Sequence, residues 1–304
     1  MAAFQRILVD IDAAAPRHPA LSQAFDLAAR AGARLTIMDV LPHVPKAARL
    51  FATPDIENEL VQHRQECLAR AASEAPAGVT TETALLRGRP APAILDEAAR
   101  IHADLVMRAH GRDLTTPPPL FGPVDMQLLR KCPVPVWIVG PDSAGPPRRI
   151  LAAVDAATEH EEERRLNASI LDAALTVRDL WGGTLTVMNA WSPFGEDLLH
   201  SRMKAEDFEA FLAASRREAE QALDALVAGL GPESAGIATE IVKAEPHEAI
   251  LAFVDAKTID LVVMGTVGRG GVAGIVMGNT AERVLRGLRR SVLAIKPAGF
   301  TRPA

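Results

Sequence analysis

The chain has 304 residues, of which 48% are hydrophobic, so it can form one large domain or two of ordinary size. Its formal net charge is −5 and no block of lysine or arginine stands out, which argues against nucleic-acid binding through a basic face. The two cysteines are too few for a disulfide framework, and no stretch suits a signal peptide or a membrane span. We therefore expect a soluble, cytoplasmic protein.

The first half alternates short apolar runs with amphipathic stretches. The expected elements, in chain order, are a strand at 6–12, a helix at 20–31 that ends at Gly32, a strand at 35–40, a long helix at 56–75, and strands at 103–107 and 134–139. A short segment rich in proline and glycine follows at 140–147 and is typical of a domain boundary.

The second half repeats the first. RILVDID at 6–12 returns as RILAAVD at 149–155, and LTIMDV at 35–40 returns as LTVMNA at 185–190. The runs at 103–107 and 134–139 return at 259–264 and 291–295, and a long amphipathic helix is expected at 205–230. The offset between the halves grows from 143 to 157, which indicates insertions in the connecting segments of a duplicated unit.

Alternating strands and helices favour a parallel sheet, because right-handed crossovers place helices on both of its faces. We expect two doubly wound α/β domains, at residues 1–142 and 147–304. Each is expected to be an open five-stranded parallel sheet of the Rossmann-like kind, with helices on both faces.

A glycine-rich stretch follows the fourth predicted strand of the second half. GTVGRGGVAGIVMGNT, 265–280, carries six glycines in sixteen residues directly after LVVM. Glycines at the carboxyl edge of a parallel sheet leave backbone N–H groups free to face an anion, and Arg269 can add a charged contact. Asn279 and Glu282 have the spacing of a capping box, so a helix N-terminus is expected there. A tight surface loop is the alternative.

Other site motifs fit poorly. No Gly-Lys pair occurs, which excludes a Walker-type phosphate loop. The match to G-x-G-x-x-A at 268–273 follows the fourth strand, whereas a dinucleotide fingerprint belongs after the first, so an NAD-linked oxidoreductase is only weakly suggested. The eight histidines lack the spacing of metal-binding motifs.

The spacing Gly265-x2-Gly268-x9-Gly278 resembles the nucleotide-binding signature of the universal stress protein family. The opening strand that ends in aspartate, the segment at Pro246 and the closing SVLAIKP at 291–297 support this resemblance. It covers nearly the whole chain, which is similar to a tandem member with two such domains.

The resemblance implies that ATP or a related adenine nucleotide, with or without Mg²⁺, binds the second half. The positions that it assigns to the adenosine end are Ala153, Val154, Asp155 and Ala190. The positions that it assigns to the ribose and phosphates are Met264, Gly265, Val267, Gly268, Gly278, Asn279, Thr280 and Ala281. The family usually has Ser or Thr where this chain has Asn279, which affects the expected affinity, and Asp155 could instead cap the following segment.

The first half lacks the motif. We align Arg108 with Gly265, the first glycine of the second-half motif. In this alignment the spacing from Arg108 to Gly122 is one residue longer than the spacing from Gly265 to Gly278. Pro123 stands where a backbone N–H would face a phosphate, and proline has no N–H. Pro123 suits a first helical turn, so the fold is expected to persist. His110 and Arg112 could bind an acidic molecule, although a solvated loop is the simpler reading.

The expected function is a stress-response protein that senses or regulates through bound nucleotide and hydrolyses ATP slowly, if at all. The alternative is a scaffold, or a carrier of a small apolar or acidic ligand. The partner is an adenine nucleotide and an unidentified protein, with no nucleic acid and no membrane. The last strands of the two halves are expected to pair as an intramolecular pseudo-dimer, as the resemblance implies, and homodimerisation stays open.

Overall fold

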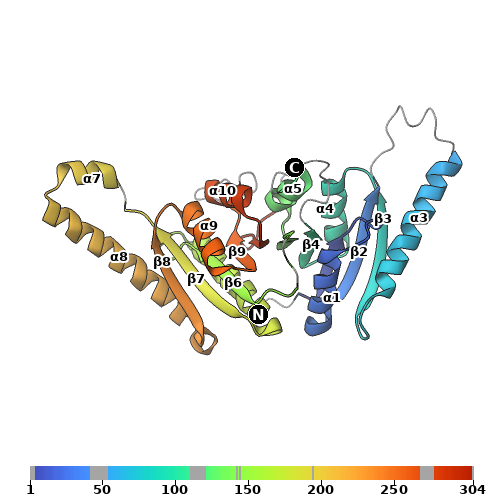
Figure 1. Ribbon diagram of the computed structural model, residues 1–304, viewed down its shortest axis with the longest axis horizontal. Helices are drawn as coiled ribbons and strands as arrows, with labels where there is room; N and C mark the ends of the chain where they lie inside the picture. The colour runs from blue at the N-terminus through green and yellow to red at the C-terminus, as the bar shows by residue number, and fades with distance from the viewer. Residues whose placement is uncertain are drawn as a thin grey trace. The chain divides into compact units, whose positions relative to one another are not determined.

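The computed structural model describes residues 4–41, 54–109, 121–141, 143, 145–193, 195–267 and 277–302. They form two compact units (Figure 1). The first comprises mainly residues 2–146, and the second comprises mainly residues 147–300.

The first unit is a five-stranded parallel sheet in the order β3-β2-β1-β4-β5. Its elements are β1 (Arg6–Asp10), α1 (Pro19–Ala31), β2 (Arg34–Leu41), α3 (Pro54–Ser73), β3 (Thr80–Arg87), α4 (Pro90–Arg100), β4 (Leu105–Ala109), α5 (Pro123–Lys131) and β5 (Val136–Val139). α1 and α3 pack on the sheet, and α3 lies along β3 in Figure 1. α4 and α5 contact each other.

The second unit repeats this architecture with strand order β10-β9-β6-β7-β8. Its elements are β6 (Arg149–Val154), α6 (Glu161–Trp181), β7 (Thr184–Trp191), α7 (Glu196–Arg202), α8 (Ala205–Ala228), the 3₁₀ turn η1 (Gly231–Ser234), β8 (Ile237–Lys243), α9 (Pro246–Lys257), β9 (Leu261–Gly265), α10 (Asn279–Gly287) and β10 (Ser291–Ile295). α6 packs on β6 and β9, and α8 lies along β8 (Figure 1). The predicted α/β fold is confirmed.

The same local chemistry ends the first helix of each unit. α1 ends at Gly32 with φ 66°, as predicted, and α6 ends at Gly182 with φ 65°. Both glycines lie in the left-handed region, where a residue without Cβ is favoured. The buried central strands β1 and β9 are nearly continuous apolar runs, as expected for parallel strands covered on both faces.

Strand pairing corrects the predicted alignment of the repeats. Asp10 pairs with Arg108 between β1 and β4, and its counterpart Ala153 pairs with Met264 between β6 and β9. Arg108 is therefore equivalent to Met264, and Ala109, not Arg108, is equivalent to Gly265. The offset is 156 here and not 157, and the same offset relates Gly122 to Gly278. The two loops consequently have equal length, so the predicted extra residue in the first half is wrong.

Candidate functional site

The candidate site lies at the carboxyl ends of β6, β7 and β9 in the second unit. Ala153 is the Cα partner of Met188 on one side and of Met264 on the other, and Val154 pairs with Asn189. The end of β6, which leads into Asp155, is thus adjacent to the end of β9, which leads into the glycine stretch. Ligands of open parallel sheets bind at this edge.

The base of the glycine loop is closed by backbone contacts. Val267 and Met277 form an antiparallel bridge, and the Gly278 N–H donates to the carbonyl of Thr266 at 3.0 Å. α10 begins immediately afterwards, so its N-terminus is held beside the end of β9. The predicted site residues Gly268 and Arg269 lie outside the described residues.

α10 begins one residue earlier than the predicted capping box requires. Gly278 is the N-cap, with φ −63° and ψ 144°, and its carbonyl accepts the first helical hydrogen bond from the Glu282 N–H at 2.9 Å. Asn279 is therefore the first helical residue and not the cap. The side chain of Glu282, the predicted partner in the capping box, accepts a hydrogen bond from Arg286 at 2.7 Å. The N–H groups of the first three residues, Asn279 to Ala281, have no acceptor within the helix, which makes this end suited to an anion.

The predicted residues differ in how they face the site. The side chains of Met264 and Ala281 are buried, so these two positions can offer a ligand only their backbone. Asn279 is exposed, and the partly exposed positions are Ala153, Val154, Asp155, Ala190, Gly265, Val267, Gly278 and Thr280.

Two buried amides, which sequence reasoning missed, hold the loop around Asp155. The Asp155 N–H donates to Asn167 Oδ1 at 3.2 Å, and Asn167 Nδ2 donates to the Asp155 carbonyl at 2.7 Å. The Ala156 N–H donates to Asn189 Oδ1 at 3.1 Å. α6 starts at Glu161 with His160 as its N-cap, so Asp155 does not cap that helix. A polar residue inside the apolar run LTVMNA was the available signal for Asn189.

Leu166 of α6 explains the glycine at 265 in structural terms. A Cβ built on Gly265 would lie 2.6 Å from Leu166 Cδ2, which is closer than carbon atoms approach. The absence of a side chain at Gly265 thus lets α6 pack on the end of β9. The group that approaches Gly265 most closely is thus the Leu166 side chain.

In the first unit the equivalent edge is filled by a buried ion network. Arg108 has no exposed surface, and its guanidinium bonds Asp10 at the end of β1 and Asp125 in the first turn of α5, the latter at 2.7 Å. Asp125 also accepts the Gly122 N–H at 3.0 Å. Asp10 and Asp125 are equivalent to Ala153 and Ala281 of the second unit. The cation and the two acids replace three uncharged residues.

A second ion network, formed by Arg64, Asp12 and Asp39, lies at the same sheet edge. Arg64 of α3 bonds Asp12, the equivalent of Asp155, and Asp39, the equivalent of Asn189, the latter at 2.8 Å. Burial acts to lower the pKa of Arg64, but the two carboxylates outweigh it and raise that pKa above its usual value. Asp39 still accepts a backbone N–H, from Ala13 at 3.2 Å, as Asn189 does from Ala156.

The remaining predictions for the first half concern Pro123, His110 and Arg112. Pro123 is the first residue of α5, as predicted, and supplies no N–H there. His110 and Arg112 lie outside the described residues. The described ranges contain no cluster of three or more His, Cys, Asp or Glu side chains arranged for a metal ion. Within those same ranges no helix is long and apolar enough to cross a membrane.

Comparison with known proteins agrees with this architecture. The model of the universal stress protein family matches residues 3–140 and 147–296. Universal stress protein E of Escherichia coli K12 is 28% identical over 310 residues, covering 100% of this chain and 97% of the relative.

Two solved structures match nearly the whole chain. A protein of Pseudomonas aeruginosa described as functionally unknown superposes with a TM-score of 0.70 at 26% identity, covering 97% of this chain and 94% of that one. A universal stress protein of Archaeoglobus fulgidus has the same fold, with a TM-score of 0.69 at 19% identity, covering 98% of this chain and 99% of that one. The chain therefore belongs to the universal stress protein family, as a tandem member with one family domain in each half.

Proposed function

We propose that the second unit binds ATP or a related adenine nucleotide, and that the bound nucleotide regulates how this stress-response protein engages an unidentified protein partner. One observation carries the proposal. The N-terminus of α10, with three N–H groups that have no helical acceptor, is held at the end of β9 by the Gly278–Thr266 hydrogen bond. Asp155 lies at the neighbouring strand end.

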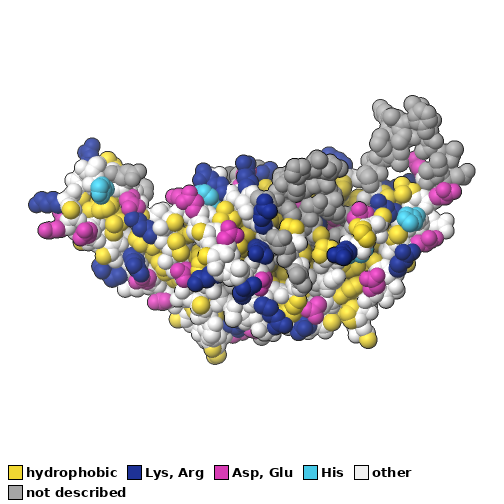
Figure 2. Space-filling view, in the orientation of Figure 1, with side chains coloured by type: hydrophobic (Ala, Val, Ile, Leu, Met, Phe, Trp, Pro, Cys, Tyr) yellow, Lys and Arg dark blue, Asp and Glu magenta, His cyan; other side chains and the backbone are white. Residues whose placement is uncertain are grey.

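The charge around α10 supports an anionic ligand. Arg283 is an exposed residue of this helix, and Figure 2 shows basic side chains gathered over it. The positive end of the helix dipole lies at Asn279 and adds to the attraction for phosphate. Over α8, by contrast, acidic and basic side chains alternate (Figure 2).

We propose binding and regulation as the role of the site, with ATP hydrolysis slow at most. Phosphoryl transfer requires acids that hold a metal ion and a group that positions the nucleophile. Asp155 is the one acid that we assign to the crevice, and Mg²⁺ would enter with the nucleotide. We also retain the domain limits 1–142 and 147–304, the pseudo-dimer and the cytoplasmic location as predictions.

The first unit has a different electrostatic setting, and we propose that it binds no nucleotide. Asp10, Asp12, Asp39 and Asp125 surround two arginines at its sheet edge. Their four carboxylates outnumber the two cations and would repel a triphosphate.

Isothermal titration of ATP with Mg²⁺ tests the proposal. Gly278→Asp puts a negative charge at the α10 N-terminus, while aspartate is itself a good N-cap and Gly278 has a φ that any residue adopts. Gly278→Asn is the matched control, because it is similar in size and capping ability but uncharged. We expect one site per chain and at least about tenfold weaker binding for Asp than for Asn, from charge repulsion.

Other outcomes contradict the proposal. Absence of binding to folded wild type would show that the α10 terminus does not form a nucleotide site, and the scaffold or carrier alternative would then stand. Equal affinities of the Asp and Asn variants would place the phosphates elsewhere.

A further inference from the structure

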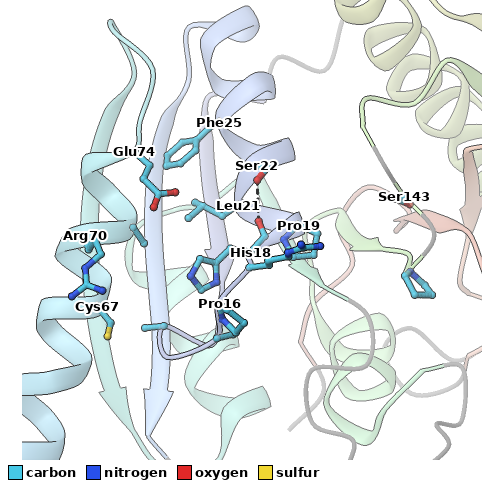
Figure 3. A pocket seen from close by; sticks show the side chains of 15 residues that line it. Pro16, His18, Pro19, Leu21, Ser22, Phe25, Cys67, Arg70, Glu74 and Ser143 are labelled. Atoms are coloured by element: carbon cyan, nitrogen blue, oxygen red, sulfur yellow. Dashed lines mark hydrogen bonds between the residues drawn. The ribbon is translucent and has the colours of Figure 1, made fainter.

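A separate pocket opens in the first unit, between α1, α3 and the segment that joins β1 to α1. Its volume is about 630 Å³. Figure 3 shows Cys67 and Arg70 on α3 and Glu74 directly after its end, with Pro16, His18, Leu21 and Phe25 on the facing segment and α1. None of the residues in the two ion networks lines it.

The pocket has a cationic rim. Arg17 and Arg70 are exposed, and neither makes an ion pair with any side chain in the described part of the chain. Glu74 is the one acid among the lining residues, against two arginines and His18. This local excess of positive charge contrasts with the net charge of −5 for the whole chain. Unpaired guanidinium groups bind carboxylates and phosphates strongly.

The inner wall is apolar and rigid. Leu21, Phe25 and Ala71 are almost fully buried but contribute to the lining. Pro16 and Pro19 restrict the backbone of the facing segment, and the Ser22 hydroxyl donates to the His18 carbonyl at 3.2 Å. An apolar floor below charged groups is the usual composition of a small-molecule site.

We propose that this pocket binds a small organic anion, whose acidic group contacts Arg17 and Arg70 and whose apolar or aromatic body rests on Leu21 and Phe25. The site lies in the unit that we expect to bind no nucleotide, and it is independent of the proposed nucleotide site. The protein then has two ligand sites of different chemistry, one in each unit.

Cys67 provides a reporter inside the pocket. The chain has two cysteines, and Cys132 is fully buried, whereas Cys67 is half-buried and lines the pocket. A thiol reagent that labels the native protein therefore reads Cys67. Ligand in the pocket is expected to slow this labelling.

The test uses full-length protein and two naphthalene probes, the anionic 1-anilinonaphthalene-8-sulfonate and the uncharged N-phenyl-1-naphthylamine. We expect saturable binding of the sulfonate that slows Cys67 labelling, and weaker binding of the neutral probe. Arg17→Ser with Arg70→Ser should weaken the sulfonate about tenfold, because two charge-assisted contacts are lost. Arg87→Ser, an exposed arginine of the same unit outside the pocket, is the matched control and should change it less than about twofold.

Three results would overturn the proposal: sulfonate binding unchanged in the double variant, Cys67 labelling unaffected by bound sulfonate, or equal affinity for the neutral probe. Saturating ATP should leave sulfonate binding unchanged. Displacement by ATP that is abolished in Gly278→Asp would show that the probe occupies the nucleotide site and would refute the pocket. Failure of ATP to bind anywhere leaves the sulfonate result unaffected, so the two proposals fail separately.

Discussion

Replacing Arg108 with methionine, the residue at the equivalent position 264, should strongly destabilise the first unit. The guanidinium of Arg108 is fully buried between Asp10 and Asp125, each 1% exposed. Arg108→Met keeps a long unbranched side chain but removes the cation. Both carboxylates are then left without their buried partner.

The expected loss follows from this geometry. Removing one partner of a buried ion pair typically costs about 3–5 kcal/mol, because the remaining charge stays desolvated. That is a large part of the roughly 5–15 kcal/mol by which a domain is stable. We therefore expect the unfolding free energy of the first unit to fall by about 3–5 kcal/mol.

Urea unfolding followed by tryptophan fluorescence measures this loss in one unit. Trp137 is buried in β5, where it pairs with Met107, the neighbour of Arg108. The other two tryptophans, Trp181 and Trp191, lie in the second unit and can be replaced by phenylalanine. The remaining signal then reports the first unit, which matters because a chain of two units need not unfold in one step.

A triple variant provides the matched control. Asp10→Ala, Arg108→Met and Asp125→Ala together install the residues that the second unit has at these positions, Ala153, Met264 and Ala281. The triple variant should regain most of the stability, apart from about 1 kcal/mol for the lost Asp125 contact to the helix terminus. A loss below about 1 kcal/mol in the single variant, or a triple variant no more stable than the single, would refute the reasoning.

Two further predictions concern the second unit. Gly265→Ala should lower its unfolding free energy by less than about 1 kcal/mol, because the new methyl group meets the end of the partly exposed Leu166 side chain, which can move aside. A loss above about 2 kcal/mol in urea unfolding would contradict this expectation. Burial acts to raise the pKa of Asp260, but hydrogen bonds from the Arg149 side chain and from the N–H groups of Arg149 and Arg148 outweigh it and lower that pKa. This carboxylate therefore stabilises the unit above its unfolded pKa of about 3.9, and the contribution is lost as pH falls through the folded value. The urea concentration at the unfolding midpoint should therefore fall at acidic pH, and Asp260→Asn should make this fall shallower. An unchanged fall in the variant would argue against the assignment.

The sequence predicted the elements whose signals are local. The helix that ends at Gly32 carries its stop signal within the window that defines it, and the stretches at 6–12 and 149–155 share four of seven residues. Pro123 at the start of α5 follows in the same way, because proline is tolerated only in a first helical turn.

The repeat register was missed by one residue for a physical reason. DLVM and DLVVM contain adjacent apolar residues that can be aligned from either end. The structure aligns them by the aspartate, because Asp104 accepts the N–H groups of Gln5 and Arg6 just as Asp260 accepts those of Arg148 and Arg149. These contacts join residues about a hundred positions apart, which no local pattern records.

The position of the candidate site could be predicted from the sequence, but its side-chain contacts could not. The position of the glycine stretch at the end of β9 followed from strand order, but the cap of α10 was placed at Asn279 although Gly278 fills that position. Glycine and asparagine are both good N-caps, so composition does not separate them. Leu166, Asn167 and Arg64 act through side-chain contacts from other helices and could not be inferred from spacing.

The buried network of Arg108 also constrains how this protein can evolve. Conversion to the uncharged arrangement of the second unit needs three substitutions, and each intermediate that lacks the arginine alone or the acids alone leaves a desolvated charge inside the fold. Single mutations therefore meet a stability barrier, and Pro123 would still withhold a donor at the end of the path. The first unit can therefore vary at other positions one residue at a time, whereas its sheet edge can take the uncharged arrangement only through coordinated substitutions.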